Sequence, residues 1–192
     1  TDTFVSFPAA NTVSVETGGS ERARIDSAGR FLVGTSTARA VGGAGDSLLQ
    51  IEGANAKSQI SIIRNQASNA GPALSFGKTR GGSVGGTTVV QSGDKLGTIR
   101  FNGADGTDLV SDAASIVAEV DGTPGANDMP GRLVFSTTAD GASSSTTRLT
   151  IDSAGTSTFT GNITTTGNIT GGNILTLSGI APNIVFTETN GD

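Results

Sequence analysis

The pentapeptide Ile25-Asp26-Ser27-Ala28-Gly29 recurs unchanged as Ile151-Asp152-Ser153-Ala154-Gly155, 126 residues further along the chain. The match extends upstream, where Arg22-Ala23-Arg24 aligns with Arg148-Leu149-Thr150. The residues up to the aspartate alternate like a strand, and Asp-Ser-Ala-Gly is a turn in which glycine is free to take a positive φ. Short β-type stretches follow at 31–33 and 157–159. The repeat therefore predicts a strand–turn–strand unit that is used twice.

This repeat divides the sequence into three parts. Residues 1–40 are predicted to end one β module, residues 41–155 to form a complete module, and residues 156–192 to begin the next. The chain opens at Thr1 rather than at a methionine, and we interpret it as a piece of a longer polypeptide.

Strands are expected throughout the middle part, where apolar and polar residues alternate between clusters of turn residues. The predicted strands are 48–52, 59–64, 73–78, 88–91, 95–102, 115–121, 132–137 and 146–152. Consecutive apolar residues around 109–119 make helix and strand hard to separate. We expect a strand from Ser115, with a helical turn before it.

The C-terminal part contains a shorter repeat. Gly-Asn-Ile occurs at 161–163, 167–169 and 172–174, separated by threonine-rich spacers. One apolar residue per repeat predicts stacked short strands that place each isoleucine inward. One such strand has too small a face to fold alone, so we expect an intertwined β-helical or β-prism segment in which three chains wind together.

The composition predicts an all-β chain that associates with copies of itself. Hydrophobic residues make up 34% of the chain, against about 45–50% in typical globular domains, whereas 29 of the 192 residues are glycine. A single chain of this kind buries little apolar surface, and association supplies the rest of the interior. We therefore expect an elongated oligomer, and the composition alone does not fix the number of its copies.

Several function classes are disfavoured. The net charge is −5 and the basic residues are scattered, which argues against a nucleic-acid partner. No apolar run approaches the roughly 18 residues of a membrane span, so membrane insertion is not expected. Histidine, cysteine, tyrosine and tryptophan are absent, which removes histidine-based catalysis and imidazole or thiolate metal sites. We predict no enzyme, no catalytic or cofactor-binding residues, and no cofactor.

Sites with oxygen ligands remain possible, because the chain contains aspartate and glutamate. Asp105 and Asp108 lie in a glycine-rich loop that fits either a calcium site or a solvated turn whose side chains cap the backbone. Gly42-Gly43-Ala44-Gly45-Asp46 resembles a calcium-binding glycine repeat only faintly. Gly81–Gly86 has neither the lysine nor the helix of a phosphate loop.

Four segments form a distinctive combination: Gly97–Gly103, Glu119–Gly125, Met129–Thr138 and Arg148–Gly155. In this combination they resemble the modules of phage tail-fibre and virion structural proteins, especially those of cyanobacterial phages. The resemblance covers most of residues 20–192. It implies a virion location, a homotrimeric fibre attached to other tail proteins, and host contact at the distal end.

The leading functional prediction is a shaft that spaces and presents a receptor-binding tip. One alternative is a module whose loop tips, around 81–86, 103–111 and 122–130, bind a host surface polysaccharide. A capsid decoration protein and a glycan-degrading tailspike are further alternatives.

Overall fold

We describe the protein from a computed structural model that covers residues 2–43, 45–54 and 58–167. Ten strands and no helix are found among these residues. The strands are β1 (Phe4–Ser6), β2 (Val13–Thr17), β3 (Ser20–Ile25), β4 (Phe31–Val33), β5 (Leu49–Ile51), β6 (Lys95–Gly103), β7 (Ser111–Val120), β8 (Gly131–Thr137), β9 (Thr146–Ile151) and β10 (Ser157–Phe159). The prediction of an all-β chain is confirmed.

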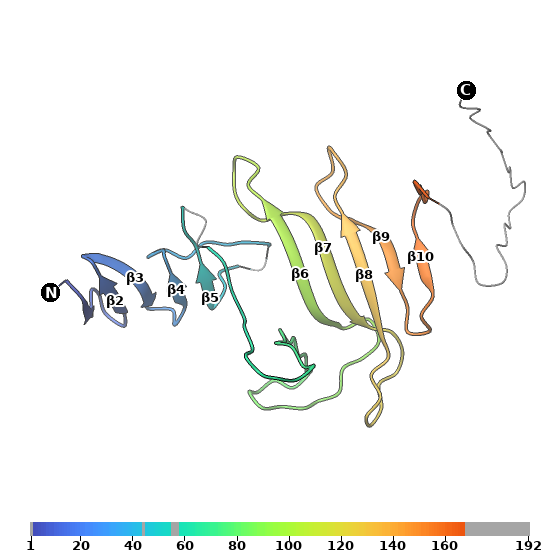
Figure 1. The fold of residues 1–192 in the computed structure, drawn as a ribbon, viewed down its shortest axis with the longest axis horizontal. Helices are drawn as coiled ribbons and strands as arrows, with labels where there is room; N and C mark the ends of the chain where they lie inside the picture. The colour runs from blue at the N-terminus through green and yellow to red at the C-terminus, as the bar shows by residue number, and fades with distance from the viewer. Residues whose placement is uncertain (1, 44, 55–57, 168–192) are drawn as a thin grey trace, which may run out of the picture. The chain divides into compact units, whose positions relative to one another are not determined.

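The strands form two open five-stranded sheets, which Figure 1 shows as separate ribbons. The first sheet has the order β1-β2-β3-β4-β5, antiparallel except for the parallel pair β4–β5. The second has the order β10-β9-β8-β7-β6 and is antiparallel throughout. Consecutive strands are neighbours in both sheets. The second sheet is therefore an antiparallel meander, whereas the parallel pair β4–β5 of the first sheet is joined by a longer crossover connection, residues 34–48.

The repeated pentapeptide forms the same hairpin twice. In the first copy the Asp26 carboxylate accepts hydrogen bonds from the Ala28 and Arg30 amides, both at 3.0 Å. In the second, Asp152 accepts from Ala154 at 3.0 Å and from Thr156 at 2.8 Å. The turn glycines Gly29 and Gly155 have φ values of 77° and 83°. The strand–turn–strand prediction is confirmed at both places.

Three predicted strands are wrong. Residues 59–64, 73–78 and 88–91 contain no strand in the structure, although their apolar residues alternate. Ile60 is 71% exposed and Leu74 69% exposed, and neither segment pairs with a described strand of the same chain. Because a strand needs a partner ladder for its amides and carbonyls, alternation alone did not produce one.

The helical turn predicted before Ser115 is also wrong, because strand β7 already begins at Ser111. Strands β6 and β8 flank β7 on both sides, with Asp112 opposite Asn102 and Ala114 opposite both Phe101 and Thr137. Hydrogen bonds to the neighbouring strands on both edges hold this apolar run extended, and they outweigh its local conformational preference.

The chain divides into two compact units, residues 1–161 and residues 162–192. Of the Gly-Asn-Ile repeats, only residues up to 167 are described, and those from 162 to 167 contain no strand. The predicted stacked strands at 167–169 and 172–174 thus lie largely outside the described residues. The module boundaries predicted at residues 40 and 155 stay predictions.

Candidate interaction surface

One face of the second sheet carries a continuous row of large apolar side chains. The strand register places Ile99 opposite Ile116, Ile116 opposite Phe135, Phe135 opposite Leu149, and Leu149 opposite Phe159. Residues directly opposite on adjacent strands share a face of the sheet. The row therefore crosses all five strands. We call this face of the second sheet, with the neighbouring Phe101, Leu133 and Ile151, the second apolar face.

The first sheet has an equivalent surface. Its register aligns Val5, Val15, Ala23, Val33 and Ile51 in one row across all five strands. A second row joins Val13, Ile25, Phe31 and Leu49. We call this the first apolar face.

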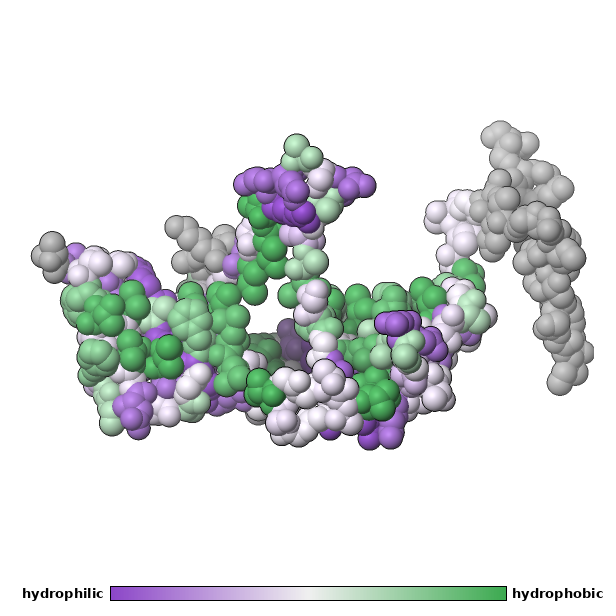
Figure 2. Space-filling view, turned by 90° about the horizontal axis from the view of Figure 1, so that it is seen from below, coloured by the Kyte–Doolittle hydropathy of each residue, from purple (hydrophilic) through white to green (hydrophobic). Residues whose placement is uncertain are grey.

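Many large side chains of both faces stay exposed in the described part of the chain. Phe159 is 49% exposed, Ile99 44%, and Leu49 53%. Figure 2, in which hydrophobic residues are green, shows such residues gathered at the surface over both sheets. Fully buried large apolar side chains are few among the described residues, with Leu32 and Val120 the largest. Exposed apolar patches of this extent on a folded chain mark interaction surfaces.

A single aromatic ring from the strandless segment lies against the second apolar face. Phe76 lines a groove of about 310 Å³ together with Leu96, Ile99, Ile116 and Leu133. The ring is possible there because position 97 is glycine. A Cβ built on Gly97 would lie 2.7 Å from Cβ and 2.9 Å from Cγ of Phe76.

Replacing Gly97 with alanine is therefore expected to displace Phe76 and to lower the free energy of unfolding by about 1–3 kcal/mol, the usual cost of overpacking. Gly103→Ala is the matched control, since it lies on the same strand and a Cβ there meets nothing within 4 Å. Thermal denaturation of both variants measures the difference. Equal stabilities of the two would show that Phe76 does not pack on Gly97.

The opposite face of the second sheet is polar. The Arg132 guanidinium binds the Glu119 carboxylate at 2.8 Å and that of Asp121 at 3.3 Å. Arg100 pairs with Asp112, which also accepts a hydrogen bond from the Asn102 amide at 2.7 Å. The amide and hydroxyl of Ser153 and the nearby Arg132 lower the pKa of Asp121. This face is mainly polar, although the buried Val117 also lies on it, and the large exposed apolar side chains are on the other face.

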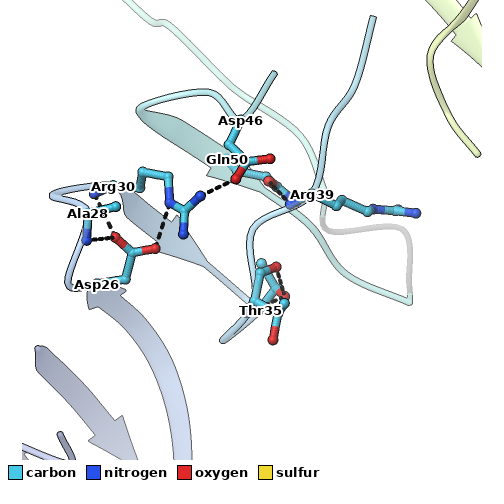
Figure 3. A network of polar contacts seen from close by, with 8 residues as sticks. Asp26, Ala28, Arg30, Thr35, Arg39, Asp46 and Gln50 are labelled. Atoms are coloured by element: carbon cyan, nitrogen blue, oxygen red, sulfur yellow. Dashed lines mark hydrogen bonds and ion pairs between the residues drawn. The ribbon is translucent and has the colours of Figure 1, made fainter. Parts of the chain in front are cut away.

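A polar network closes the first hairpin of the chain (Figure 3). The Arg30 guanidinium binds the Asp26 carboxylate at 2.6 Å and also pairs with Asp46. Hydrogen bonds from the amide and side chain of Arg30 and from the Ala28 amide lower the pKa of Asp26. Asp46, the acidic residue of the faint calcium-like repeat, thus serves as a partner for arginine.

The Asp105 side chain is bound to the backbone of its own loop. One Asp105 carboxylate oxygen accepts the Thr107 and Asp108 amides at 2.8 and 3.1 Å, and the other accepts the Ser111 hydroxyl at 2.9 Å. Asp108 accepts the Val110 amide at 3.0 Å. Hydrogen bonds from the Thr107 and Asp108 amides lower the pKa of Asp105. Its oxygens cap the backbone of a turn.

The described part of the chain holds no group of three or more histidine, cysteine, aspartate or glutamate residues that could bind a metal. Within the same residues, no helix long and apolar enough to cross a membrane is found. The loop Gly81–Gly86 folds back on itself, with the Gly86 amide donating to the Ser83 carbonyl at 3.1 Å.

The loop segments 77–79 and 86–90 border a wider groove of about 730 Å³, and Gly125, Ala126 and Met129 line its other side. Two of the three loops predicted as tips thus contribute to one groove. Sequence reasoning did not place these two loops together, because no residue pattern relates them.

Comparison with solved structures identifies the fold. The chain is similar to the C-terminal domain of the L-shaped tail fibre of bacteriophage T5, with a TM-score of 0.60 and 17% identity over 94% of this chain and 78% of that one. The chain has the fold of a phage tail-fibre domain. The same domain together with its intramolecular chaperone domain gives a TM-score of 0.61 and 18% identity, over 95% of this chain and 54% of that one.

No family model and no curated protein matches the sequence. The resemblance to phage tail-fibre modules predicted from short motifs is confirmed as a structural similarity to the T5 tail fibre. At 17–18% identity, the similarity concerns the fold. The exposed apolar faces are therefore the feature of this chain that points to a function.

Proposed function

We propose that this chain is a non-enzymatic shaft segment of a phage tail fibre, of the kind found in cyanobacterial phages, that acts as a homotrimer in the virion. Its role is to space and present a distal receptor-binding tip, and its other partners are tail proteins of the same particle. The fold similarity and the sequence resemblance support this proposal, and the two exposed apolar faces carry it.

The apolar faces support self-association for a physical reason. On each face one row of these residues crosses all five strands of its sheet, which is wider than the single exposed hydrophobic residues of a normal protein surface. Copies of one chain that meet around a symmetry axis cover the same face on every copy at once. The polar face of the second sheet, with its arginine–carboxylate pairs, then points outward to water.

Sedimentation of the purified chain tests the proposal. We expect a species of three times the 19.0 kDa chain mass, with a frictional ratio typical of an elongated particle and resistance to protease. A stable, compact monomer at micromolar concentration would contradict it.

A second candidate function is suggested by the wide groove between residues 77–90 and 125–129. Lysine and threonine side chains line the groove together with valine, alanine and methionine. The backbone and hydroxyl groups of this mixed lining suit a host surface polysaccharide. Binding of the trimer to host cells, lost on removal of the cell-surface polysaccharide, would favour this function over a pure shaft.

A further inference from the structure

The connection between β5 and β6 contains a short apolar segment that no strand covers. We call residues 59–64, with the sequence Gln-Ile-Ser-Ile-Ile-Arg, the isoleucine segment. Its three isoleucines, at positions 60, 62 and 63, are all exposed. Figure 1 draws residues 58–94 without a strand arrow. Neighbouring exposed isoleucines are unfavourable in water, so we expect a partner to cover them.

Polar contacts at both ends tie the isoleucine segment to its own chain. The Ser58 hydroxyl donates a hydrogen bond to the Gly53 carbonyl at 3.2 Å. At the other end, the Arg64 guanidinium donates to the side-chain oxygen of Gln66 at 2.8 Å. The Gln66 carbonyl in turn accepts the Ser68 amide at 2.8 Å. The flanking polar groups are thus bonded locally, whereas the isoleucines between them face solvent.

The second apolar face offers a surface of the matching kind. Its groove of about 310 Å³ is lined by Leu96, Ile99, Ile116 and Leu133 of the sheet, together with Phe76. None of the three isoleucines lines this groove in the single chain. Ile99 and Leu133 are exposed side chains. The groove can therefore accept apolar side chains from another copy.

A ring of three copies needs two different contact surfaces on each chain. Around a threefold axis one patch of a copy meets a different patch of the next copy, and the ring closes when every copy has used both patches. This chain carries such a pair, because the extended isoleucine segment and the grooved sheet face are both apolar and both exposed.

We propose that the isoleucine segment of one copy packs into the groove of the second apolar face of the next copy. This inference rests on the proposed homotrimer and adds which parts of the chain meet in it. Phe76 provides an example of the contact, since it comes from the same connection and already lies against β6 over Gly97. In the trimer Ile60 and Ile62, which an extended backbone turns to the same side, exchange water for the sheet residues of the groove.

Cross-linking between two variants of the complete 192-residue chain tests the contact, because the chain has no cysteine of its own. Ile62→Cys and Leu133→Cys chains are produced in the same cells, so a link from residue 62 to residue 133 can only join different copies. A bis-maleimide that spans roughly 10 Å, the distance between packed β layers, is expected to give 62–133 links as the main product. Thr147→Cys in place of Leu133→Cys is the matched control, since Thr147 lies on the polar face of the same sheet.

Two results of this experiment would overturn the proposal. One is an equal yield of links from residue 62 to residues 133 and 147. The other is a product with only 133–133 links, which is expected if like faces meet each other.

A chain that carries both Ile62→Cys and Leu133→Cys tests whether the segment packs on its own groove instead. Co-assembly with an excess of the unmodified chain should abolish the 62–133 link, because the neighbouring copies then lack cysteine. A link that persists under this dilution would place the contact within one chain and overturn the proposal.

A substitution gives a second readout that needs no cysteine. Ile60→Ser is expected to lower the association constant at least about 10-fold, because each contact between copies then loses a buried isoleucine. Circular dichroism should be unchanged, since the segment belongs to no strand. Leu48→Ser is the matched control, because Leu48 is 73% exposed, like Ile60 at 71%, but lies in neither apolar row.

Sedimentation of the unmodified chain beside these variants separates the two proposals. A monomeric unmodified chain would overturn the shaft proposal and this one with it. A trimer that Ile60→Ser weakens no more than Leu48→Ser does would overturn this inference alone.

Discussion

Replacing Ile99 with aspartate is expected to abolish self-association of the chain while leaving the two sheets folded. Ile99 begins the apolar row of the second sheet, on the edge strand β6, and is 44% exposed in the single chain. A carboxylate there remains hydrated as long as the face is open. In the proposed trimer the same carboxylate is buried without a partner in every copy.

The expected loss is large because an unpaired buried charge costs several kcal/mol. Each of the three copies contributes one such charge, so the association constant should fall by at least about 1,000-fold. Sedimentation across a concentration series measures this loss, and circular dichroism shows whether the strands persist.

The matched control is Thr98→Asp. Thr98 precedes Ile99 on the same strand, but it points to the polar face, where it shares a shallow groove with Lys95 and Arg100. The added charge lies on the polar face, in a groove that holds the cations Lys95 and Arg100 and the carboxylates Asp112 and Glu119. It does not enter the apolar face, so the trimer should persist. Dissociation of both variants to the same extent would show that the apolar face is not the contact between copies.

The strands predicted from the sequence are correct where the segment pairs with another strand of the chain. Residues 95–102, 132–137 and 146–152 alternate, and the structure forms β6, β8 and β9 there with shifts of at most one residue. Residues 59–64 and 73–78 alternate equally well, yet they contain no strand. Local patterns encode the preference for an extended chain, whereas the ladder that fixes a strand depends on segments far away in the sequence.

The second apolar face was likewise predictable from the sequence only in part. Alternation in Thr98-Ile99-Arg100-Phe101 predicts that β6 has one apolar face, but no local pattern aligns Ile99 with Phe135 or Phe159. The alignment comes from the register of four strand pairs, three of which contain bulges or tight turns. The repeated Asp-Ser-Ala-Gly turn was predictable because the hydrogen bonds from its backbone amides to the aspartate carboxylate lie within five residues.

Replacing Gly34 with alanine is expected to detach β5 from the first sheet. Gly34 follows β4 directly, has a φ of 78°, and donates its amide to the Arg22 carbonyl at 3.0 Å. A Cβ at this position would fall far inside van der Waals contact with the backbone carbonyl oxygen of Glu52, which follows β5. The backbone fixes the position of a Cβ at residue 34, and the Glu52 oxygen is itself a backbone atom. No side-chain rotation therefore relieves the overlap.

The expected cost has two parts. An L-residue at positive φ loses about 1–2 kcal/mol, and the overlap with Glu52 adds about 1–3 kcal/mol of overpacking. Part of the loss should appear as local opening of β4–β5, since the Glu52 amide bonds to Val33 at 3.0 Å and that bond must break. Amide exchange of Glu52 and thermal denaturation measure the two effects.

Gly43→Ala separates the two parts. Gly43 has a φ of 70°, so it carries the same conformational penalty, but a Cβ there meets nothing within 4 Å. This control should lose only the first part and keep slow exchange at Glu52. If both variants lose the same stability and Glu52 stays protected in Gly34→Ala, then the approach of Gly34 to β5 is not what requires glycine at this position.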